Sequence, residues 1–87
     1  MTSKVTPAFR ECFRSLPPEV RRQAVKQHRM WVQNPRHPSL QFKQLFPNVW
    51  SVRINDDYRA VARRNRHLIV WFWIGRHDEY NQIIRKS

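Results

Sequence analysis

Apolar residues in the first part of the chain recur at helical spacing. The first such stripe, at positions i, i+3, i+4 and i+7, consists of Phe9, Cys12, Phe13 and Leu16. In a helix these four side chains share one face. Thr6 followed by Pro7 is a typical helix start, because threonine can cap the first turn and proline has no N–H for that turn to leave unbonded. The pair Pro17 and Pro18 predicts the end of this helix.

A second helical stripe follows this proline pair. Its members are Val20, Ala24, His28 and Trp31. Glu19 is an acid in the predicted first turn, where the helix dipole favours a negative charge. Asn34 and Pro35 end the pattern, so we expect two helices joined by a very short connection as a helical hairpin. Because His28 lies on the apolar stripe, we expect a hydrogen-bonded core histidine.

From residue 42 the period changes to two, which is typical of strands. Residues 49–54 alternate between two faces, the polar cluster at 55–57 predicts a turn, and residues 58–63 resume the alternation. This pattern indicates a β-hairpin. Residues 68–74 are apolar at every position, so we expect a central strand covered on both faces.

Each end of the chain adds a short element. Lys4 and Val5 are expected to begin a strand, and Asp78 can cap a short helix. The apolar residues of this helix are Tyr80, Ile83 and Ile84. The predicted fold is α+β: an N-terminal helical hairpin packed on a small, mainly antiparallel sheet, with a short C-terminal helix. Residues 1–87 are expected to form a single domain.

The predicted β-hairpin brings two arginines face to face. Matching the apolar faces of its strands places Arg53 directly across from Arg59 on the other face. Two such charges about 5 Å apart repel each other by about 1 to 3 kcal/mol. A phosphate bound between them would turn this repulsion into a net attraction. Alternatively, both side chains are solvated or paired with Asp56 and Asp57. A four-residue loop would change this register.

The charge of the chain points to an anionic partner. Lys and Arg number 17 against 6 Asp and Glu, a net charge of +11, and 13 of the 17 are arginine. Arginine can hold a phosphate through two parallel hydrogen bonds, so nucleic acid is the first partner to consider. Three tryptophans could stack on bases, but we expect them to pack in the core. They are Trp50, Trp71 and Trp73.

Several function classes are disfavoured by residue counts. One cysteine, Cys12, allows no internal disulfide and no cysteine-rich zinc module. One glycine, Gly75, is too few for a phosphate-binding glycine loop. Four scattered histidines include no close ligand pair, so we expect neither a metal nor a cofactor. No apolar run approaches the roughly 20 residues that span a bilayer, and no secretion signal opens the chain. We therefore expect a cytoplasmic protein without a membrane partner.

Candidate chemistry follows the predicted central strand. Residues 76–80 are all polar or titratable and come directly after a rigid element, a common functional position. His77 is a candidate acid or base because imidazole exchanges protons near neutral pH, but a histidine at a helix start is often simply exposed. Tyr80 could equally be a core residue, and Asp78 only a cap. His37, in a proline-containing loop, is a further candidate for ligand contact.

Four motifs together resemble the RelE/ParE toxin superfamily. They are HPSL at 37–40, WSVRI at 50–54, YRAV at 58–61 and WIGRHDEY at 73–80. Their order, behind a helical hairpin in a small basic chain, is similar to that of RelE-like chains from toxin–antitoxin operons. The resemblance covers nearly the whole chain. It implies a compact toxin with a sheet flanked by helices, neutralised by a cognate antitoxin that wraps it.

The resemblance also implies roles for individual residues. RelE-type toxins bind in the ribosomal decoding site and cleave messenger RNA by attack of a 2′-hydroxyl on the adjacent phosphate. By this resemblance, Arg53 and Arg59 would hold the scissile phosphate, while His77 and Tyr80 would supply acid or base groups. Further RNA contacts would come from Lys43, Arg76, Arg63 and His37. Ser51 stands where RelE carries a basic residue, so a lysine-dependent mechanism does not carry over.

Three functions are compatible with these residues. The leading hypothesis is a ribosome-dependent mRNA endonuclease whose partners are an antitoxin, the ribosome and mRNA. The second is inhibition of DNA gyrase, as by ParE-type members, which needs no acid or base. The third is a degenerate toxin that only binds RNA or its antitoxin, because a fold does not by itself determine an activity. Toxicity that survives loss of His77 would distinguish the second from the first.

Overall fold

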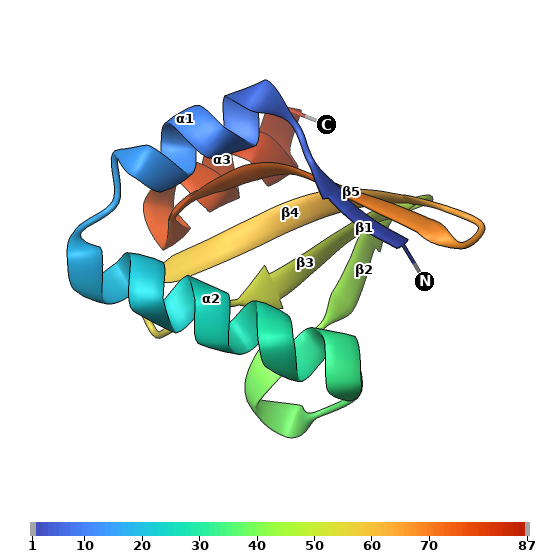
Figure 1. Ribbon diagram of the computed structural model, residues 1–87. Helices are drawn as coiled ribbons and strands as arrows, with labels where there is room; N and C mark the ends of the chain where they lie inside the picture. The colour runs from blue at the N-terminus through green and yellow to red at the C-terminus, as the bar shows by residue number, and fades with distance from the viewer. Residues whose placement is uncertain (1, 87) are drawn as a thin grey trace.

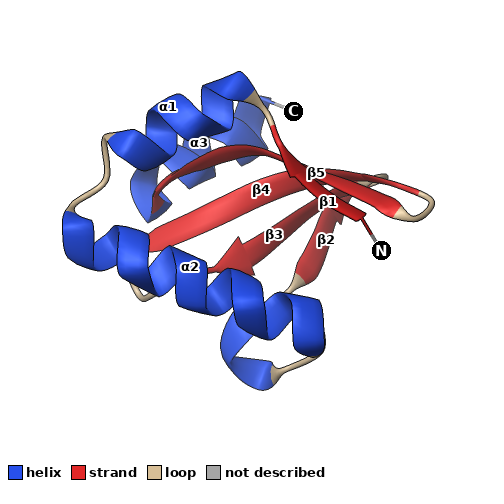
Figure 2. Cartoon of the chain, in the orientation of Figure 1, coloured by secondary structure: helices blue, strands red, loops and turns tan. Residues whose placement is uncertain are grey.

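The computed structural model describes residues 2–86, except the side chains of Ile84 and Lys86 (Figures 1 and 2). In chain order its elements are β1 Thr2–Val5, α1 Pro7–Arg14, α2 Pro18–Gln33, the 3₁₀ turn η1 Pro38–Leu40, β2 Lys43–Phe46, β3 Val49–Arg53, β4 Tyr58–Asn65, β5 Leu68–Arg76 and α3 His77–Lys86. The α+β class is therefore confirmed. The expected place of Ile84 in an apolar stripe lies outside the described side chains.

The described strands form one sheet in the order β1-β5-β4-β3-β2. Strand β1 pairs with β5 in parallel, and the other neighbours pair antiparallel. The helices lie on both sides: α1 and α2 cover the front face as Figure 1 is drawn, and α3 lies against the back face. A mainly antiparallel sheet flanked by helices is thus confirmed.

Strand β5 is not the central strand, and its two faces differ in burial. The centre of the sheet is β4, because β1 adds an edge outside β5. On β5, Ile69, Trp71 and Ile74 are buried in the front-face core, whereas Phe72 and Trp73 are only half-buried. The continuous apolar run therefore does not reflect equal cover on both faces. The single helix α3 covers only part of the back.

The hydrophobic core lies between the front face of the sheet and the two N-terminal helices. Its aromatic centre is Trp31 of α2, whose ring lies 5.5 Å from that of Trp71 and 5.8 Å from that of Phe42, both edge to face. The remaining buried members of the core are Leu16, Val20, Ala24, Leu40, Val52, Ile54, Ala60, Ala62, Ile69 and Ile74. The apolar stripes of both predicted helices thus face the sheet.

The two N-terminal helices do not form a closely packed hairpin. Helix α1 begins as expected, with the Phe9 N–H donating to Thr6 Oγ1 at 3.0 Å. Helix α2 follows after a short connection, but the two helices cover different parts of the sheet (Figure 2). An apolar crevice of about 270 Å³ lies between them, lined by residues such as Phe13, Val25 and Ile74.

His28 is hydrogen-bonded but not in the core. The residue is exposed, and its Nε2 lies 3.0 Å from the hydroxyl of Ser3 on β1. Because Trp71 Nε1 donates to the same hydroxyl at 2.9 Å, the Ser3 proton is free to be donated to His28. The ring also stacks on Trp31, with centroids 6.1 Å apart. This partial burial lowers the pKa of His28. Its expected position in the core is wrong, because the buried face of α2 passes through Ala24, Gln27 and Trp31 and leaves His28 at its edge.

Candidate functional site

The hairpin of β3 and β4 has the predicted register. Arg53 and Arg59 are direct partners on the back face, and the turn between the strands is held by Asn55, whose Oδ1 accepts from two backbone N–H groups. The two guanidinium groups nevertheless diverge. Arg53 forms an ion pair with the exposed carboxylate of Asp56. The alternative of carboxylate pairing therefore holds for Arg53, whereas Arg59 has a different environment.

Arg59 is a buried and incompletely bonded cation. The residue is only 8 % exposed. Its Nη2 donates to Gln41 Oε1 at 2.9 Å, while Nη1 is buried and has no hydrogen-bond partner among the described residues. An unsatisfied buried donor of this kind costs about 1 to 3 kcal/mol. A phosphate oxygen bound at Nη1 would supply both the missing acceptor and a compensating charge.

Tyr80 of α3 lies over this arginine. The centre of its ring is 5.3 Å from the Arg59 Cζ atom, and the residue is 3 % exposed. Its hydroxyl lies 3.3 Å from the hydroxyl of Ser51, which is completely buried on β3. The sheet face that carries the two arginines is therefore covered at Arg59, because α3 folds back across β4. Tyr80 is both a packed residue and a site residue.

His77 lies at the edge of the same cluster. It is the first residue of α3, and its backbone N–H donates to the carbonyl oxygen of Asp57 at 2.7 Å, which fixes the start of the helix beside the β3–β4 turn. Its half-buried ring lies 5.5 Å from the ring of Tyr80, and its Nδ1 lies 3.4 Å from the Asn81 side-chain nitrogen. Arg59, Tyr80 and His77 thus form one connected group.

The four remaining candidate residues lie at different distances from this group. Lys43 is exposed on β2 opposite Ser51, so it borders the cluster on the back face. Arg63 lies four residues further along β4, over the Phe72 ring. The other two candidates do not lie beside Arg59. Arg76 lies over the ring of Tyr58, which packs against the front-face core, and His37 Nδ1 accepts the Ser39 N–H that caps η1.

Two features of the site, the roles of Gln41 and Gly75, were not predicted from the sequence. Gln41, the partner of Arg59, has a left-handed backbone with φ of 44°, and no local motif marks it. Gly75 pairs with Arg59 across β5, and a Cβ atom at this glycine would lie 2.6 Å from Cζ2 of Trp73. The Trp73 ring therefore lies across the glycine backbone beside the site.

The geometry defines a class: a small, basic α+β domain with a buried arginine, a tyrosine and a histidine on one connected back-face cluster. The ParE-like toxin domain family matches residues 18–82. The chain therefore belongs to the ParE-like toxin domain family, within the RelE/ParE superfamily. Comparison with curated protein sequences finds no match.

Solved structures of toxins share the fold at low sequence identity. YafQ from E. coli has a TM-score of 0.73 at 8 % identity, over 90 % of this chain and 94 % of that one. The YoeB/ParE toxin from Agrobacterium tumefaciens has a TM-score of 0.69 at 15 % identity, over 88 % and 99 %. The toxin–antitoxin complex RelBE2 from Mycobacterium tuberculosis also scores 0.69, at 20 % identity over 87 % and 96 %. The arrangement of helices around the sheet is thus a toxin fold.

Within residues 2–86, no helix is both long and apolar enough to cross a membrane.

Proposed function

We propose that this chain is the toxin of a toxin–antitoxin system and cleaves messenger RNA on the ribosome. The observation that carries the proposal is the buried Arg59 guanidinium, which keeps one nitrogen without a partner beneath the ring of Tyr80. A cation in this state is suited to an anion whose charge increases during the reaction, as the charge on a phosphodiester does in its transition state.

The proposed reaction is an internal transfer of the phosphoryl group. The 2′-oxygen of the ribose loses its proton to a base and bonds to the adjacent phosphorus, while the bond from phosphorus to the 5′-oxygen breaks. An acid protonates the leaving 5′-oxygen, so that a cyclic phosphate and a 5′-hydroxyl result. Arg59 would stabilise the phosphate charge, and His77 and Tyr80 would exchange the protons.

Access to Arg59 requires α3 to move. Tyr80 covers the guanidinium in the closed arrangement, and the helix starts directly at the end of β5 without a loop between them. An outward rotation of α3 about the Arg76–His77 junction would expose Arg59 and Ser51 while keeping His77 close to them. Lys43, exposed beside Ser51, would then extend the positive surface along the RNA backbone.

Inducible expression with mapping of transcript ends tests this function. We expect the unmodified chain to arrest growth and to produce new transcript ends, and we expect His77→Ala and Arg59→Met to abolish both effects. Arg10→Gln, at an exposed position of α1, is the matched control and should remain toxic. Growth arrest and cleavage that persist in both site variants would contradict the proposal.

A second candidate function is inhibition of DNA gyrase, which the ParE-like family description favours. Such an inhibitor would bind gyrase through its surface and would not use His77 as an acid or base. A supercoiling assay with the purified chain separates the two functions. Blocked supercoiling that persists in His77→Ala, together with unchanged transcript ends, would replace the endonuclease by this second function.

The proposed antitoxin partner would carry acidic and apolar residues together. The apolar crevice between α1 and α2 continues into a hollow lined by cations of α2, and Val25 lines both. These cations are Arg21, Arg22, Lys26 and Arg29. We expect the product of the adjoining open reading frame to co-purify with this chain. Val25→Asp should weaken that complex, whereas Val32→Asp, at an exposed valine that does not line the crevice, should not.

A further inference from the structure

The turn between β4 and β5 is the most projecting part of the sheet. In Figure 1 this hairpin reaches to the right beyond the neighbouring strands, at the end opposite the β3–β4 turn. Its last pairs are Arg64 with Ile69 and Asn65 with Leu68, while β3 stops pairing with β4 at Arg63. Both edges of this hairpin are flanked almost to its end, since Thr2 of β1 pairs with Leu68 and the Asn48 carbonyl oxygen accepts the Arg64 N–H. Residues 63–67 form the projecting end of the sheet, which we call the basic finger.

The basic finger carries positive charge without nearby compensation in the sequence. Residues 63–67 include three arginines, and residues 58–77 contain no Asp or Glu. Neither of the two ion pairs within residues 2–86 involves this segment. Arg63, Asn65, Arg66 and His67 are exposed, and Arg64 is half-buried. Such a concentration of one charge repels itself in the free protein and is relieved by an anionic partner.

Two of these arginines are held in position by aromatic rings on opposite faces. Arg63 lies over Phe72 on the back face, with its Cζ 5.4 Å from the ring centre. Arg64 lies over Trp50 on the front face at 5.6 Å, and Trp50 in turn stacks on Phe42 at 4.7 Å. A guanidinium on a ring keeps its N–H edges available for phosphate. The contacts therefore reduce the freedom of both side chains without consuming their donors.

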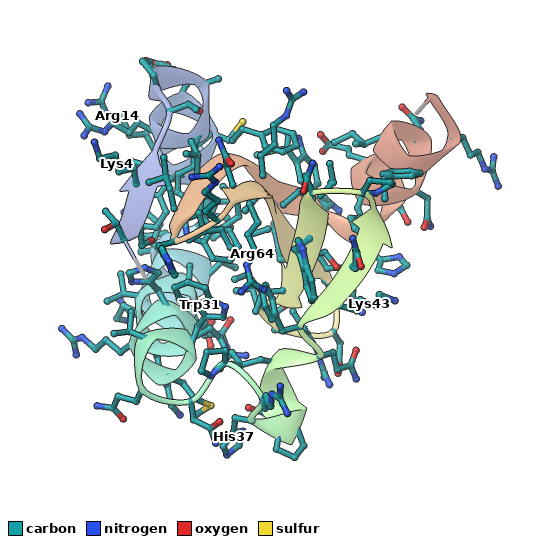
Figure 3. All side chains as sticks on the ribbon, turned by 90° about the vertical axis from the view of Figure 1, so that its right-hand side faces the viewer. Lys4, Arg14, Trp31, His37, Lys43 and Arg64 are labelled. Atoms are coloured by element: carbon teal, nitrogen blue, oxygen red, sulfur yellow. The ribbon has the colours of Figure 1, made fainter. Side chains whose placement is uncertain are left out.

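The surrounding end of the molecule is also basic. Figure 3 faces this end of the sheet, with Arg64 near the middle, Lys4 on the left and Lys43 on the right. Asn65 lies six residues along β4 from Arg59, a distance of about 20 Å. The basic finger is thus a second positive region, separate from the buried arginine.

We propose that the basic finger docks on double-helical RNA. A projecting end of a sheet with arginines on both faces can reach the two phosphate backbones on either side of a groove. The minor groove of A-form RNA is wide and shallow and presents 2′-hydroxyls, which can exchange hydrogen bonds with the Asn65 and His67 side chains at the tip. This docking surface goes beyond the cleavage proposed at Arg59 and does not depend on it.

Fluorescence anisotropy with the full chain and a labelled RNA duplex of about 16 base pairs tests this surface, with salt varied. The finger variant is Arg63→Gln/Arg64→Gln/Arg66→Gln. The matched control, Arg10→Gln/Arg22→Gln/Arg36→Gln, removes the same charge from exposed positions elsewhere. If each finger arginine contacts one phosphate, the slope of log affinity against log salt should become shallower by about 2 to 3 in the finger variant, with less than about one unit of change in the control.

A single substitution guards against misfolding of the triple variant. Arg66 has a left-handed backbone with φ of 56°, and asparagine tolerates that conformation well. Arg66→Asn should keep the unfolding midpoint and still reduce the slope by about 0.7 to 0.9. Equal losses in the finger and control variants, or equally tight binding of a DNA duplex of the same sequence, would overturn the proposal.

The same measurement separates this surface from the endonuclease site. Arg59→Met should abolish transcript cleavage and leave duplex RNA binding within about twofold, because its guanidinium is covered by Tyr80. If the unmodified chain cleaves no transcripts but its duplex binding still depends on the finger, only the proposed endonuclease fails. If cleavage persists and duplex binding does not depend on the finger, only the docking surface fails.

Discussion

The two ends of β4 hold arginine in opposite environments. At the first end, Arg59 is covered by Tyr80 and keeps one nitrogen without a partner. At the other end, Arg63 is exposed and Arg64 is half-buried, and each lies over an aromatic ring. The same residue type is a costly buried group in the first case and a solvent-accessible one in the second.

The two environments suit different functions. The covered arginine suits catalysis, and the surface arginines suit binding. A covered, unsatisfied cation has much to gain from one correctly placed anion, because low local polarity strengthens the interaction. Solvated arginines gain little from any single phosphate, but several together attract a polyanion and release its counterions. We therefore expect substitutions at Arg59 to change reaction rate, and substitutions in the basic finger to change affinity and its salt dependence.

The largest expected effect is at the covered end. Arg59→Met should reduce transcript cleavage by about 10²- to 10³-fold, as loss of a charge-stabilising donor does in other enzymes. The free energy of unfolding should stay level or rise by about 1 kcal/mol, because an apolar side chain replaces a desolvated cation. Cleavage in a translation extract and urea unfolding measure the two quantities. If Arg59→Met were destabilised but fully active, both expectations for the covered end would be wrong.

A second test concerns the packing beside Arg59. Gly75→Ala places a Cβ where Cζ2 of Trp73 lies 2.6 Å away, so the ring must shift. We expect a loss of about 1 to 3 kcal/mol in the free energy of unfolding and a change in tryptophan fluorescence. Asn65→Ala, at an exposed position of the basic finger, is the control and should have an effect below about 0.5 kcal/mol. Equal losses of unfolding free energy at both positions would mean that packing beside Arg59 is no tighter than packing in the basic finger.

The hydroxyl pair beneath α3 gives a third, smaller effect. Tyr80→Phe removes one partner of the 3.3 Å contact and leaves the Ser51 hydroxyl buried. We expect the free energy of unfolding to fall by about 1 kcal/mol, and the same for Ser51→Ala. The double variant should lose less than the sum of the two, because neither buried hydroxyl is then left alone. Additive losses in urea unfolding would mean that the two groups do not interact.

The smallest expected effect is a dependence on pH. Burial lowers the pKa of His28 below its ordinary 6.5, so the unfolded chain binds more protons at this residue than the folded chain does. The contribution of His28 to the free energy of unfolding is therefore intact above pH 6.5 and decreases as the pH falls through that value. His28→Gln should flatten this decrease, measured by thermal unfolding between pH 5 and 8. An unchanged pH profile in the variant would exclude His28 as its source.

Local periodicity predicted most of the fold. Thr6, the proline pair and the alternation at 49–63 use rules that act within a few residues, and the structure follows them. The errors concern relations across the sheet. An apolar run such as 68–74 indicates a strand but not its neighbours, so nothing in it distinguishes the centre of the sheet from a position beside the short β1.

The pairing of the two arginines in the candidate site was predictable from the sequence, whereas the residues that pack around Arg59 were not. Strand register alone placed Arg53 across from Arg59, since matching apolar faces fixes the pairing. The cover by α3 depends on where a helix packs after the strand ends, and no local pattern encodes that contact. The same limit applies to Gln41, which meets Arg59 only because the chain turns in a left-handed conformation.

The parallel pairing of β1 has a consequence for the order in which the sheet can form during synthesis. Thr2 pairs with Leu68, and Val5 pairs with Trp71. Strand β1 therefore stays unpaired during synthesis until the helices, β2, β3 and β4 have been made and β5 follows. The sheet can close at this edge only after β5 exists, so the domain cannot complete its fold one element at a time in chain order.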